Sequence, residues 1–353
     1  TDLLCRIGGD EFALITINPS RPEDAGYMAS EFINLISGSW TLVNGLNVHV
    51  GATVGISFYP DHGNTSELLL QHADAALYNA KNVQRGTFQY FTENMTVSAR
   101  YRIEQEYQLR NCIKNGHLEV FYQPQVSIKT GEICGAEALV RWNDPIKGYI
   151  QPNDFIPLAE DTGLIISIGE VVLRKTCLQG MQWLAMGLKP LRLSVNLSAH
   201  QLRHGDIVNT VKSILDDTGY PAELLELELT ESALMEREKQ VVPILETFRN
   251  MRIRLAIDDF GTGYSSLAYL KSFPINTLKI DKKFIDGIPN AKENTVLTST
   301  IISLGRNFGY DVIAEGVETI DQLEYLKNME CDLFQGYLKS KPVSADQFLL
   351  LLK

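Results

Sequence analysis

From residue 118 onward, short segments of alternating hydrophobic and polar residues are separated by longer segments in which hydrophobic residues recur every three or four positions. A period of two is typical of strands, and the longer period is typical of helices. We therefore expect strands at 118–128, 133–142, 191–197, 224–230, 253–258, 277–280, 312–314 and 333–334. Helices are expected at 152–161, 165–186, 206–218, 238–250, 291–308 and 320–328, with one more at the C-terminus.

The order of these elements predicts the fold class of the C-terminal region. The first two strands are joined by the short segment Lys129-Thr130-Gly131, which predicts an antiparallel hairpin. The later strands alternate with helices, as in an α/β fold with a mainly parallel sheet. About 235 residues with this pattern predict a TIM-like (β/α) barrel with an antiparallel first strand.

The N-terminal region has a different pattern, which predicts a small α+β domain. A hairpin is expected at 3–17, and its turn is Gly8-Gly9-Asp10-Glu11. Further strands are expected at 48–59 and 88–91, and helices at 22–36 and 66–82. We therefore divide the chain into an incomplete α+β domain at 1–92, a connecting helix at 93–117 and the barrel at 118–353.

Polar residues stand at the ends of several barrel strands. In a barrel, alternate residues of each strand face the outer helices and the lumen. Leu255 and Ile257 are expected to pack outward, so that Asp258 at the end of that strand faces inward. The same phase directs polar side chains of other strands into the same mouth, namely Glu137, Asn196, Glu228, Lys279 and Glu315. Asp259 follows Asp258 directly, and the chain then breaks at Gly261-Thr262-Gly263.

These residue types predict a site for hard cations. Carboxylates and an amide, with no soft ligand in the set, suit Mg²⁺ or Mn²⁺. So many negative charges require more than one ion, and two ions about 3.5–4 Å apart could clamp a phosphodiester for attack by water. Lys279 could orient the water or stabilise charge on the phosphate, or it could form a salt bridge that only neutralises the acids.

Composition excludes some classes of protein. The formal net charge of −11 argues against a protein that coats nucleic-acid polymers, although it permits an anionic ligand at a metal site. There is no apolar run of 18 residues, so no membrane contact is expected from this segment. The cysteines form no CxxC pair and there is no signal-peptide pattern, so we expect a cytoplasmic location. An upstream sensor or membrane region, if any, would lie outside this sequence.

The segment Gly8-Gly9-Asp10-Glu11-Phe12 resembles the signature loop of the diguanylate cyclases, the GGDEF family. The segments at 54–60 and 73–81 and the strand at 88–91 are also similar to that family. The resemblance covers only the second half of such a domain. In the family the first strand brings a metal-binding Asp, which is missing here, so a non-catalytic remnant or truncation product without cyclase activity is expected.

The barrel region closely resembles the EAL family of cyclic di-GMP phosphodiesterases over residues 101–353. The resemblance rests on an ordered set of motifs, which are Glu137-Ala-Leu139-Val-Arg141, Asn196-Leu-Ser198, Glu228-Leu-Thr-Glu231, Asp258-Asp-Phe-Gly-Thr-Gly263, Lys279-Ile-Asp281, Glu315-Gly-Val-Glu318 and Gln335-Gly-Tyr337. The ordered set is much more specific than any one of its members.

The resemblance to the EAL family implies a role for each matched residue. The first-metal ligands match Glu137, Asn196, Glu228 and Asp258. Asp259 matches a ligand of the second metal, and Lys279 and Glu315 match water-handling and metal-linked positions. Gln335 matches a required polar residue of the site, and the substrate contacts match Gln123 and Arg141. Glu231 matches the acid that steadies the loop at 259–267, which the family uses to couple homodimerisation to activity.

The resemblance therefore predicts a metal-dependent enzyme that opens cyclic di-GMP to linear pGpG and forms a homodimer through the barrel. The helix expected to begin within 264–270 would lie in the dimer interface. The alternatives are a cyclic di-GMP receptor that does not cleave its ligand and a protein-interaction scaffold. Every matched position carries the family residue, which favours the enzyme.

Overall fold

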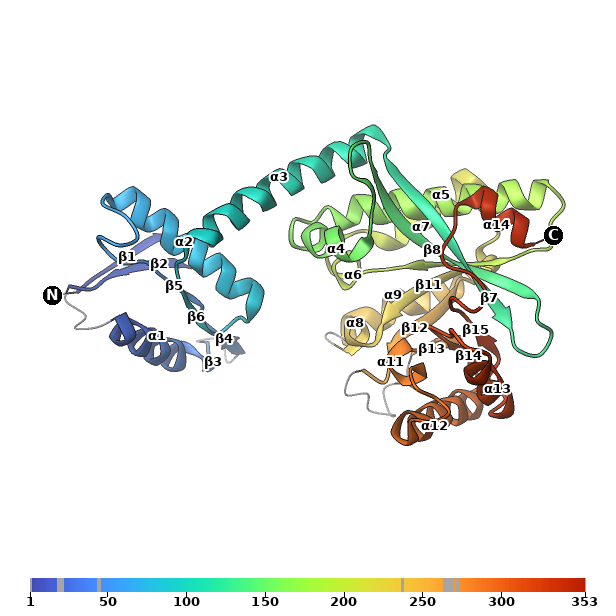
Figure 1. Ribbon diagram of the computed structural model, residues 1–353. Coiled ribbons are helices and arrows are strands. Elements are labelled where there is room, and N and C mark those ends of the chain that lie inside the picture. Colours follow the sequence, from blue (N-terminus) through green and yellow to red (C-terminus); the bar gives the residue numbers. More distant parts are fainter. Residues whose placement is uncertain are drawn as a thin grey trace. The chain divides into compact units, whose positions relative to one another are not determined.

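The structure is a computed structural model that describes residues 2–17, 22–42, 46–235, 238–262, 270 and 273–352. The chain folds into two compact units, Thr1–Gln105 and Glu106–Lys353 (Figure 1). No helix among the described residues is both long enough and apolar enough to cross a membrane.

The N-terminal unit contains short sheets and three helices in its described part. Its strands are β1 (Leu3–Gly8), β2 (Glu11–Ile15), β3 (Gly38–Thr41), β4 (Asn47–Val50), β5 (Val54–Ile56) and β6 (Phe88–Tyr90). Its helices are α1 (Pro22–Ile36), α2 (Ser66–Val83) and the start of α3 (Glu93–Asn115). The prediction of one strand at 48–59 is wrong, because β4 pairs with β3 whereas β5 pairs with β6, so the chain must leave one sheet for the other at residues 51–53.

The barrel unit begins with the predicted antiparallel hairpin. Its two strands are β7 (Leu118–Ser127) and β8 (Ile133–Asp144). The parallel strands are β10 (Arg192–Asn196), β11 (Leu225–Thr230), β12 (Arg254–Phe260), β13 (Thr277–Ile280), β14 (Asp311–Ala314) and β15 (Leu333–Phe334). The sheet closes because β10 pairs with β8 and β15 pairs antiparallel with β7. The TIM-like barrel with an antiparallel first strand is therefore confirmed.

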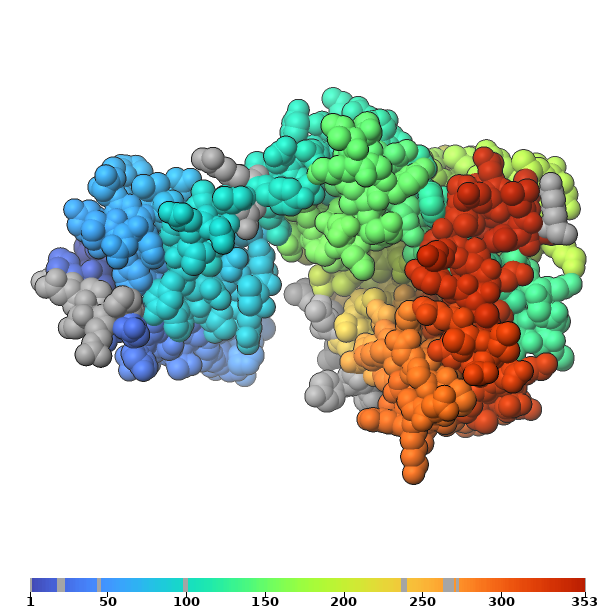
Figure 2. Space-filling view, viewed as in Figure 1, coloured from blue at the N-terminus to red at the C-terminus, as the bar shows by residue number. Residues whose placement is uncertain are grey.

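Helices surround the barrel strands (Figure 1). They are α4 (Pro152–Asp161), α5 (Ile165–Ala185), α6 (Ala199–His204), α7 (Ile207–Thr218), the 3₁₀ turn η1 (Ala222–Leu224), α8 (Glu231–Met235), α9 (Glu238–Asn250), α11 (Lys282–Ile285), α12 (Lys292–Phe308), α13 (Ile320–Asn328) and α14 (Ala345–Leu351). The C-terminal segment, red in Figure 2, packs on the barrel, where Phe348 of α14 stacks on Trp183 of α5 at 5.1 Å between ring centroids. The helix expected to begin within 264–270 cannot be compared, because residues 263–269 lie outside the described part.

The barrel strands bury both of their faces, as strands of a parallel sheet do. Leu227 of β11 and Leu278 of β13 are almost completely buried in the apolar layer between strands and helices. Their neighbours Glu228 and Lys279 are equally buried but face each other across the lumen, where their side chains form a hydrogen bond. Polar side chains of these two strands therefore face the lumen, while their apolar side chains face the helices.

Candidate functional site

The strand-end residues meet at the mouth of the barrel around the ammonium group of Lys279. Its Nζ lies 2.5 Å from Glu228 Oε2 and 2.7 Å from Glu315 Oε1. It also lies 3.3 Å from Asp258 Oδ1 and 3.5 Å from Glu137 Oε2. Because parallel strands end at the same edge, residues from β8, β11, β12, β13 and the end of β14 converge on one point. We call these residues, together with Asn196 and Asp259, the strand-end cluster.

Amide side chains hold Glu137 in place within this cluster. Asn196 Nδ2 donates a hydrogen bond to Glu137 Oε1 at 2.6 Å, and Gln335 Nε2 donates one to Glu137 Oε2 at 2.5 Å. Gln335 also donates to Gln123 Oε1 at 3.0 Å, and Gln123 in turn donates to the carbonyl oxygen of Ser340 at 3.2 Å. The chain of amides fixes both oxygens of Glu137 and leaves the carbonyl oxygen of Asn196 as a further oxygen donor.

A change in the backbone of β12 brings Asp258 and Asp259 to the same side of the strand. The register with β13 shifts between Ile257 and Phe260, and Asp259 has a left-handed backbone with φ of 53°. As a result, carboxylate oxygens of Asp258, Asp259 and Glu315 all lie within 4.8 Å of one another. Simple alternation along the strand would have directed Asp258 and Asp259 to opposite faces.

Burial and crowding of like charges disturb the pKa values of the cluster. Burial, and then the neighbouring Asp258, raise the pKa of Glu315 to about 8. Burial, followed by Asp258 and Asp281, raises the pKa of Asp259 to about 6. Burial alone would lower the pKa of Lys279, but the surrounding carboxylates raise it well above its usual value. The site thus strongly favours positive charge at its centre.

The donor atoms of the cluster fit hard divalent cations. All of the anionic and amide donors are oxygens, as Mg²⁺ and Mn²⁺ prefer. Among the residues that the structure describes, buried Glu228 Oε1 has no hydrogen-bond partner, although such an atom is usually satisfied. A cation ligand would satisfy it, so the residues at this mouth are suited to holding metal.

Two other predicted residues lie at the edge of the cluster. Glu231 is buried, and its Oε2 accepts a hydrogen bond from the backbone N–H of Gly261 at 2.8 Å, two residues after Asp259. The guanidinium of Arg141 lies 5.5 Å from the ring centroid of Phe121, and burial lowers the pKa of Arg141. Arg141 is also close enough to Glu137 and Tyr337 for their charges to affect that pKa.

The sequence analysis named Asp281 within a motif but gave it no role at the site, and it missed a second layer of polar residues in the lumen. Asp281 lies close enough to Asp259 to help raise the pKa of that carboxyl group, and it follows Lys279 by two positions, so the period of the strand could have predicted its place at the site. Glu226, Ser194 and Thr277 lie two residues before strand-end residues and are fully buried. The same period would have found them, because residues i and i+2 of a strand share a face.

The small cavity between α5, α7 and β10 is too small to be a nucleotide site. It is lined by Gly169, Leu173, Val195, Asn196 and Val211 among others, and its volume is about 20 Å³. That volume holds about one water molecule.

The fold and this cluster define a mixed α/β barrel with an acidic, oxygen-rich mouth. The EAL domain family matches residues 106–342, and the family described as "Diguanylate cyclase, GGDEF domain" matches residues 1–87. The chain therefore belongs to the EAL domain family, with GGDEF domain sequence ahead of the barrel.

Known proteins resemble the chain over almost its whole length. It is 39% identical over 348 residues to the bifunctional diguanylate cyclase/cyclic di-GMP phosphodiesterase MucR of Pseudomonas aeruginosa, covering 99% of this chain and 50% of that protein. It is 37% identical to the cyclic di-GMP phosphodiesterase NbdA of the same organism, covering 97% and 44%. A solved structure of the P. aeruginosa MucR phosphodiesterase with c-di-GMP has a TM-score of 0.68 and 41% identity, covering 69% of this chain and 99% of that one. The chain thus spans about half the length of the curated relatives it matches.

Proposed function

We propose that this chain hydrolyses cyclic di-GMP to linear pGpG in a reaction that depends on Mg²⁺ or Mn²⁺. The observation that carries the proposal is the convergence of Glu137, Glu228, Asp258 and Glu315 on Lys279 at one barrel mouth. The similarity to relatives named cyclic di-GMP phosphodiesterases supports the choice of substrate. The proposed division of the chain is a GGDEF-like part at 1–92, a connecting helix at 93–117 and the phosphodiesterase barrel at 118–353.

In this proposal the residues that would hold two metal ions are Glu137, Asn196, Glu228, Asp258, Asp259 and Glu315. When bound, divalent ions would supply Lewis-acid activation of water and compensation of phosphate charge. The orphan Oε1 of Glu228 and the close approach of Asp258, Asp259 and Glu315 support this assignment.

The proposed roles of the other residues follow from their positions. Arg141 binds phosphate oxygens, because a guanidinium presents paired N–H donors to them. Lys279 Nζ, held between Glu228 and Glu315, donates a hydrogen bond to the attacking water. Gln335 and Gln123 orient Glu137 and the substrate next to it. In the reaction, the water loses a proton as its oxygen bonds to phosphorus, the P–O3′ bond breaks, and the 3′ oxygen takes up a proton as it leaves.

The rim of the mouth supports an anionic nucleotide as ligand. Lys341 Nζ lies 5.2 Å from the ring centroid of Tyr337, whose side chain is exposed. Lys282 Nζ lies 5.9 Å from the same centroid and is also ion-paired with Glu318. Cations suit phosphates, and an exposed aromatic ring suits a base. The acidic cluster is therefore bordered by groups that favour a nucleotide.

We also propose that the chain acts as a homodimer through its barrel and that it acts in the cytoplasm. Sedimentation velocity over a range of concentrations tests the first of these proposals. A monomer with full activity at all concentrations would argue against a role for the dimer.

The direct test of the proposed reaction is to incubate the protein with cyclic di-GMP and to separate the nucleotides by chromatography. We expect pGpG with Mg²⁺ or Mn²⁺ and none after treatment with EDTA. Cyclic di-GMP that is bound but intact would instead support a receptor that does not cleave its ligand. No binding of cyclic di-GMP would support a protein-interaction scaffold. Turnover in metal-free protein would contradict the proposed metal dependence.

A further inference from the structure

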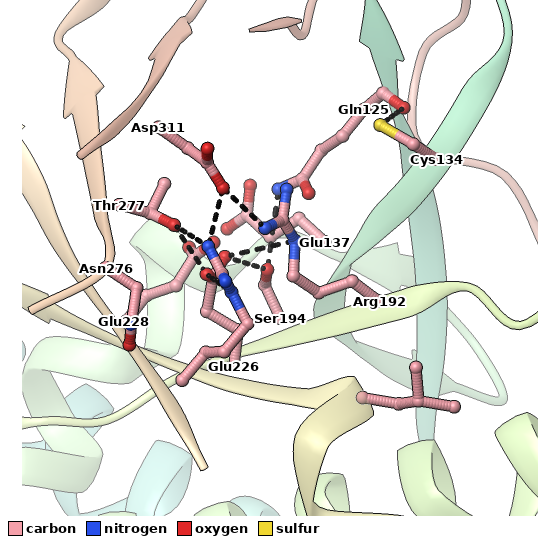
Figure 3. A network of polar contacts seen from close by, with 12 residues as sticks. Gln125, Cys134, Glu137, Arg192, Ser194, Glu226, Glu228, Asn276, Thr277 and Asp311 are labelled. Carbon is pink, nitrogen blue, oxygen red and sulfur yellow. Dashed lines mark hydrogen bonds and ion pairs between the residues drawn. The ribbon is translucent and has the colours of Figure 1, made fainter. Parts of the chain in front are cut away.

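A second set of polar side chains from the barrel strands is connected by hydrogen bonds and ion pairs, and Figure 3 shows it together with Glu137 and Glu228 of the strand-end cluster. We call it the floor network, and it comprises Gln125, Arg192, Ser194, Glu226, Arg254, Thr277 and Asp311. Glu226 lies two residues before Glu228 on β11, and Arg254 lies four residues before Asp258 on β12. Because a strand rises about 3.3 Å per residue, Glu226 lies roughly 7 Å below the strand-end cluster.

Glu226 is the centre of the floor network and is fully buried. Its Oε1 accepts a hydrogen bond from Ser194 Oγ at 3.1 Å. Its Oε2 accepts hydrogen bonds from Thr277 Oγ1 at 2.6 Å and from Arg254 Nε at 3.2 Å. Both oxygens of this carboxylate are therefore fixed in position.

Two arginines and a second acid complete the network. Arg254 Nη2 lies 2.6 Å from Asp311 Oδ2, and Arg192 Nη1 lies 3.1 Å from the same oxygen. Arg192 Nε also lies 3.7 Å from Glu226 Oε1. Two guanidinium groups thus balance two carboxylates, and the formal charge of the floor network is zero.

The strand-end cluster above the floor is not balanced in charge, because it contains five carboxylates and Lys279 is its single cation. On β12 and β14 one inward-facing apolar residue stands between the floor residue and the strand-end residue, namely Ala256 between Arg254 and Asp258 and Ile313 between Asp311 and Glu315, and both are fully buried. Apolar atoms screen charge much less than water does, so the charge of the floor acts on the cluster above it.

We propose that the floor network sets the charge beneath the metal centre. This charge is zero in the wild-type protein, and it determines how tightly the strand-end cluster binds divalent cations. The inference rests on the proposed function, since it takes this cluster to be the metal site. Glu226 acts through the field at the cluster and not by contact with substrate, so it is a positioning residue. A buried carboxylate paired with arginines, such as Glu226, is not needed for packing alone, because apolar side chains can fill such a position equally well.

Opposite changes of floor charge test the proposal. Glu226→Gln leaves the floor with a charge of +1, and Arg254→Gln leaves it with −1. We expect the first change to weaken Mn²⁺ binding and the second to strengthen it, each by about tenfold or more. Isothermal titration of Mn²⁺ without substrate measures both affinities, and thermal unfolding of each variant is followed in parallel. Arg254→Lys keeps the charge and is the matched control, with affinity expected within about twofold of wild type.

The direction of the two shifts separates electrostatic tuning from a structural role. If both charge changes weaken Mn²⁺ binding, or if neither changes it, the proposal is overturned while the proposed function stands. If the wild-type protein itself binds no Mn²⁺, the proposed metal site is wrong and this inference falls with it. Should Glu226→Gln not fold, Asp311→Asn adds charge of the same sign at a half-exposed position, and we expect it to weaken binding by about two- to threefold. Unchanged or tighter binding by Asp311→Asn would then overturn the proposal.

Discussion

Asp258 and Asp259 reach the same side of β12 because Asp259 adopts a left-handed backbone, with φ of 53°. That conformation is uncommon outside glycine but is tolerated best by Asn and Asp. It places both carboxylates near Glu315, within 4.8 Å between oxygens. Strained backbone tends to be retained where function requires it, which fits a metal-binding role. The sequence predicts two adjacent acids here but not the turn of the backbone that makes them neighbours of Glu315.

Glu137→Gln tests the role of a single carboxylate. The change keeps the size of the side chain but removes a charge that faces Lys279 at 3.5 Å. We expect kcat for cyclic di-GMP hydrolysis to fall by more than about 100-fold, because outer-shell changes at metal sites cost about 10–100-fold. The fold should survive, since the change relieves repulsion among acids, and circular dichroism checks this. Glu132→Gln, at an exposed side chain, is the control and should retain its rate. A near-native rate for Glu137→Gln would contradict the assignment.

The pKa values of Asp259 and Glu315 predict that metal binding depends on pH. These pKa values are raised to about 6 and about 8, respectively. A carboxyl group must lose its proton before it binds a cation, so protons compete with metal below those pH values. We expect Mn²⁺ affinity to rise between about pH 5.5 and 8.5 and binding to release protons. Titration calorimetry in two buffers of different ionisation enthalpy measures both effects, and affinity that is independent of pH would refute this account.

At the scale of elements, the loop after β12 is tied to the neighbouring strand. Glu231 follows β11 directly and begins α8, and its carboxylate accepts the N–H of Gly261. This bond crosses from one strand end to the next and holds the backbone beside Asp259. A movement of about 1 Å at a reacting site can cost about 100-fold in rate, so this contact can control activity.

Glu231→Ala removes the acceptor for the N–H of Gly261. We expect the Mg²⁺ concentration that gives half-maximal rate to rise by about tenfold or more, because Asp259 is no longer held in place. Glu231→Gln retains an acceptor oxygen and should have a smaller effect. Rate-versus-Mg²⁺ titrations measure the shift, and sedimentation follows dimerisation in the same samples. Superimposable titration curves would show that the loop is not coupled to the site.

Hydrophobic periodicity predicted the barrel strands well, because alternate residues of each strand face the outer helices and the lumen. The predicted strand 277–280 agrees with β13, and the phase correctly directed Glu228 and Lys279 inward. Pairing between distant segments was harder to predict. The edge strand β9 (Gly148–Ile150) was not predicted, because it is short and is stabilised by pairing with β8. The split between β4 and β5 was missed for the same reason, since their partners are β3 and β6.

At the scale of the whole molecule, the acidic residues that could bind a cation lie together in the barrel unit. Within the described ranges, the group of three acids close enough to share a cation is Asp258, Asp259 and Glu315, all in the barrel unit. Asp10 lies in the turn between β1 and β2, Glu11 begins β2, and both are exposed. The GGDEF sequence is therefore present without a comparable cluster in the part of its unit that the structure describes.

This distribution predicts that the chain makes no cyclic di-GMP from GTP. Incubation of Glu137→Gln with GTP and Mg²⁺ tests the prediction, because that variant should not degrade any product that forms. We expect GTP to remain unchanged in chromatograms taken over several hours. Accumulation of cyclic di-GMP would contradict the prediction and would assign a cyclase site to the N-terminal unit.

The most direct test of the central claim is to locate Mn²⁺ by anomalous scattering in crystals of protein whose hydrolysis of cyclic di-GMP has been measured. The account predicts anomalous peaks within ligand distance of Glu137, Glu228 and Asp258, and beside Asp259 and Glu315. It also predicts that treatment with EDTA removes the anomalous peaks and abolishes hydrolysis. Active protein whose crystals hold Mn²⁺ elsewhere, or hold none, would contradict the claim that the strand ends of this barrel form the active site.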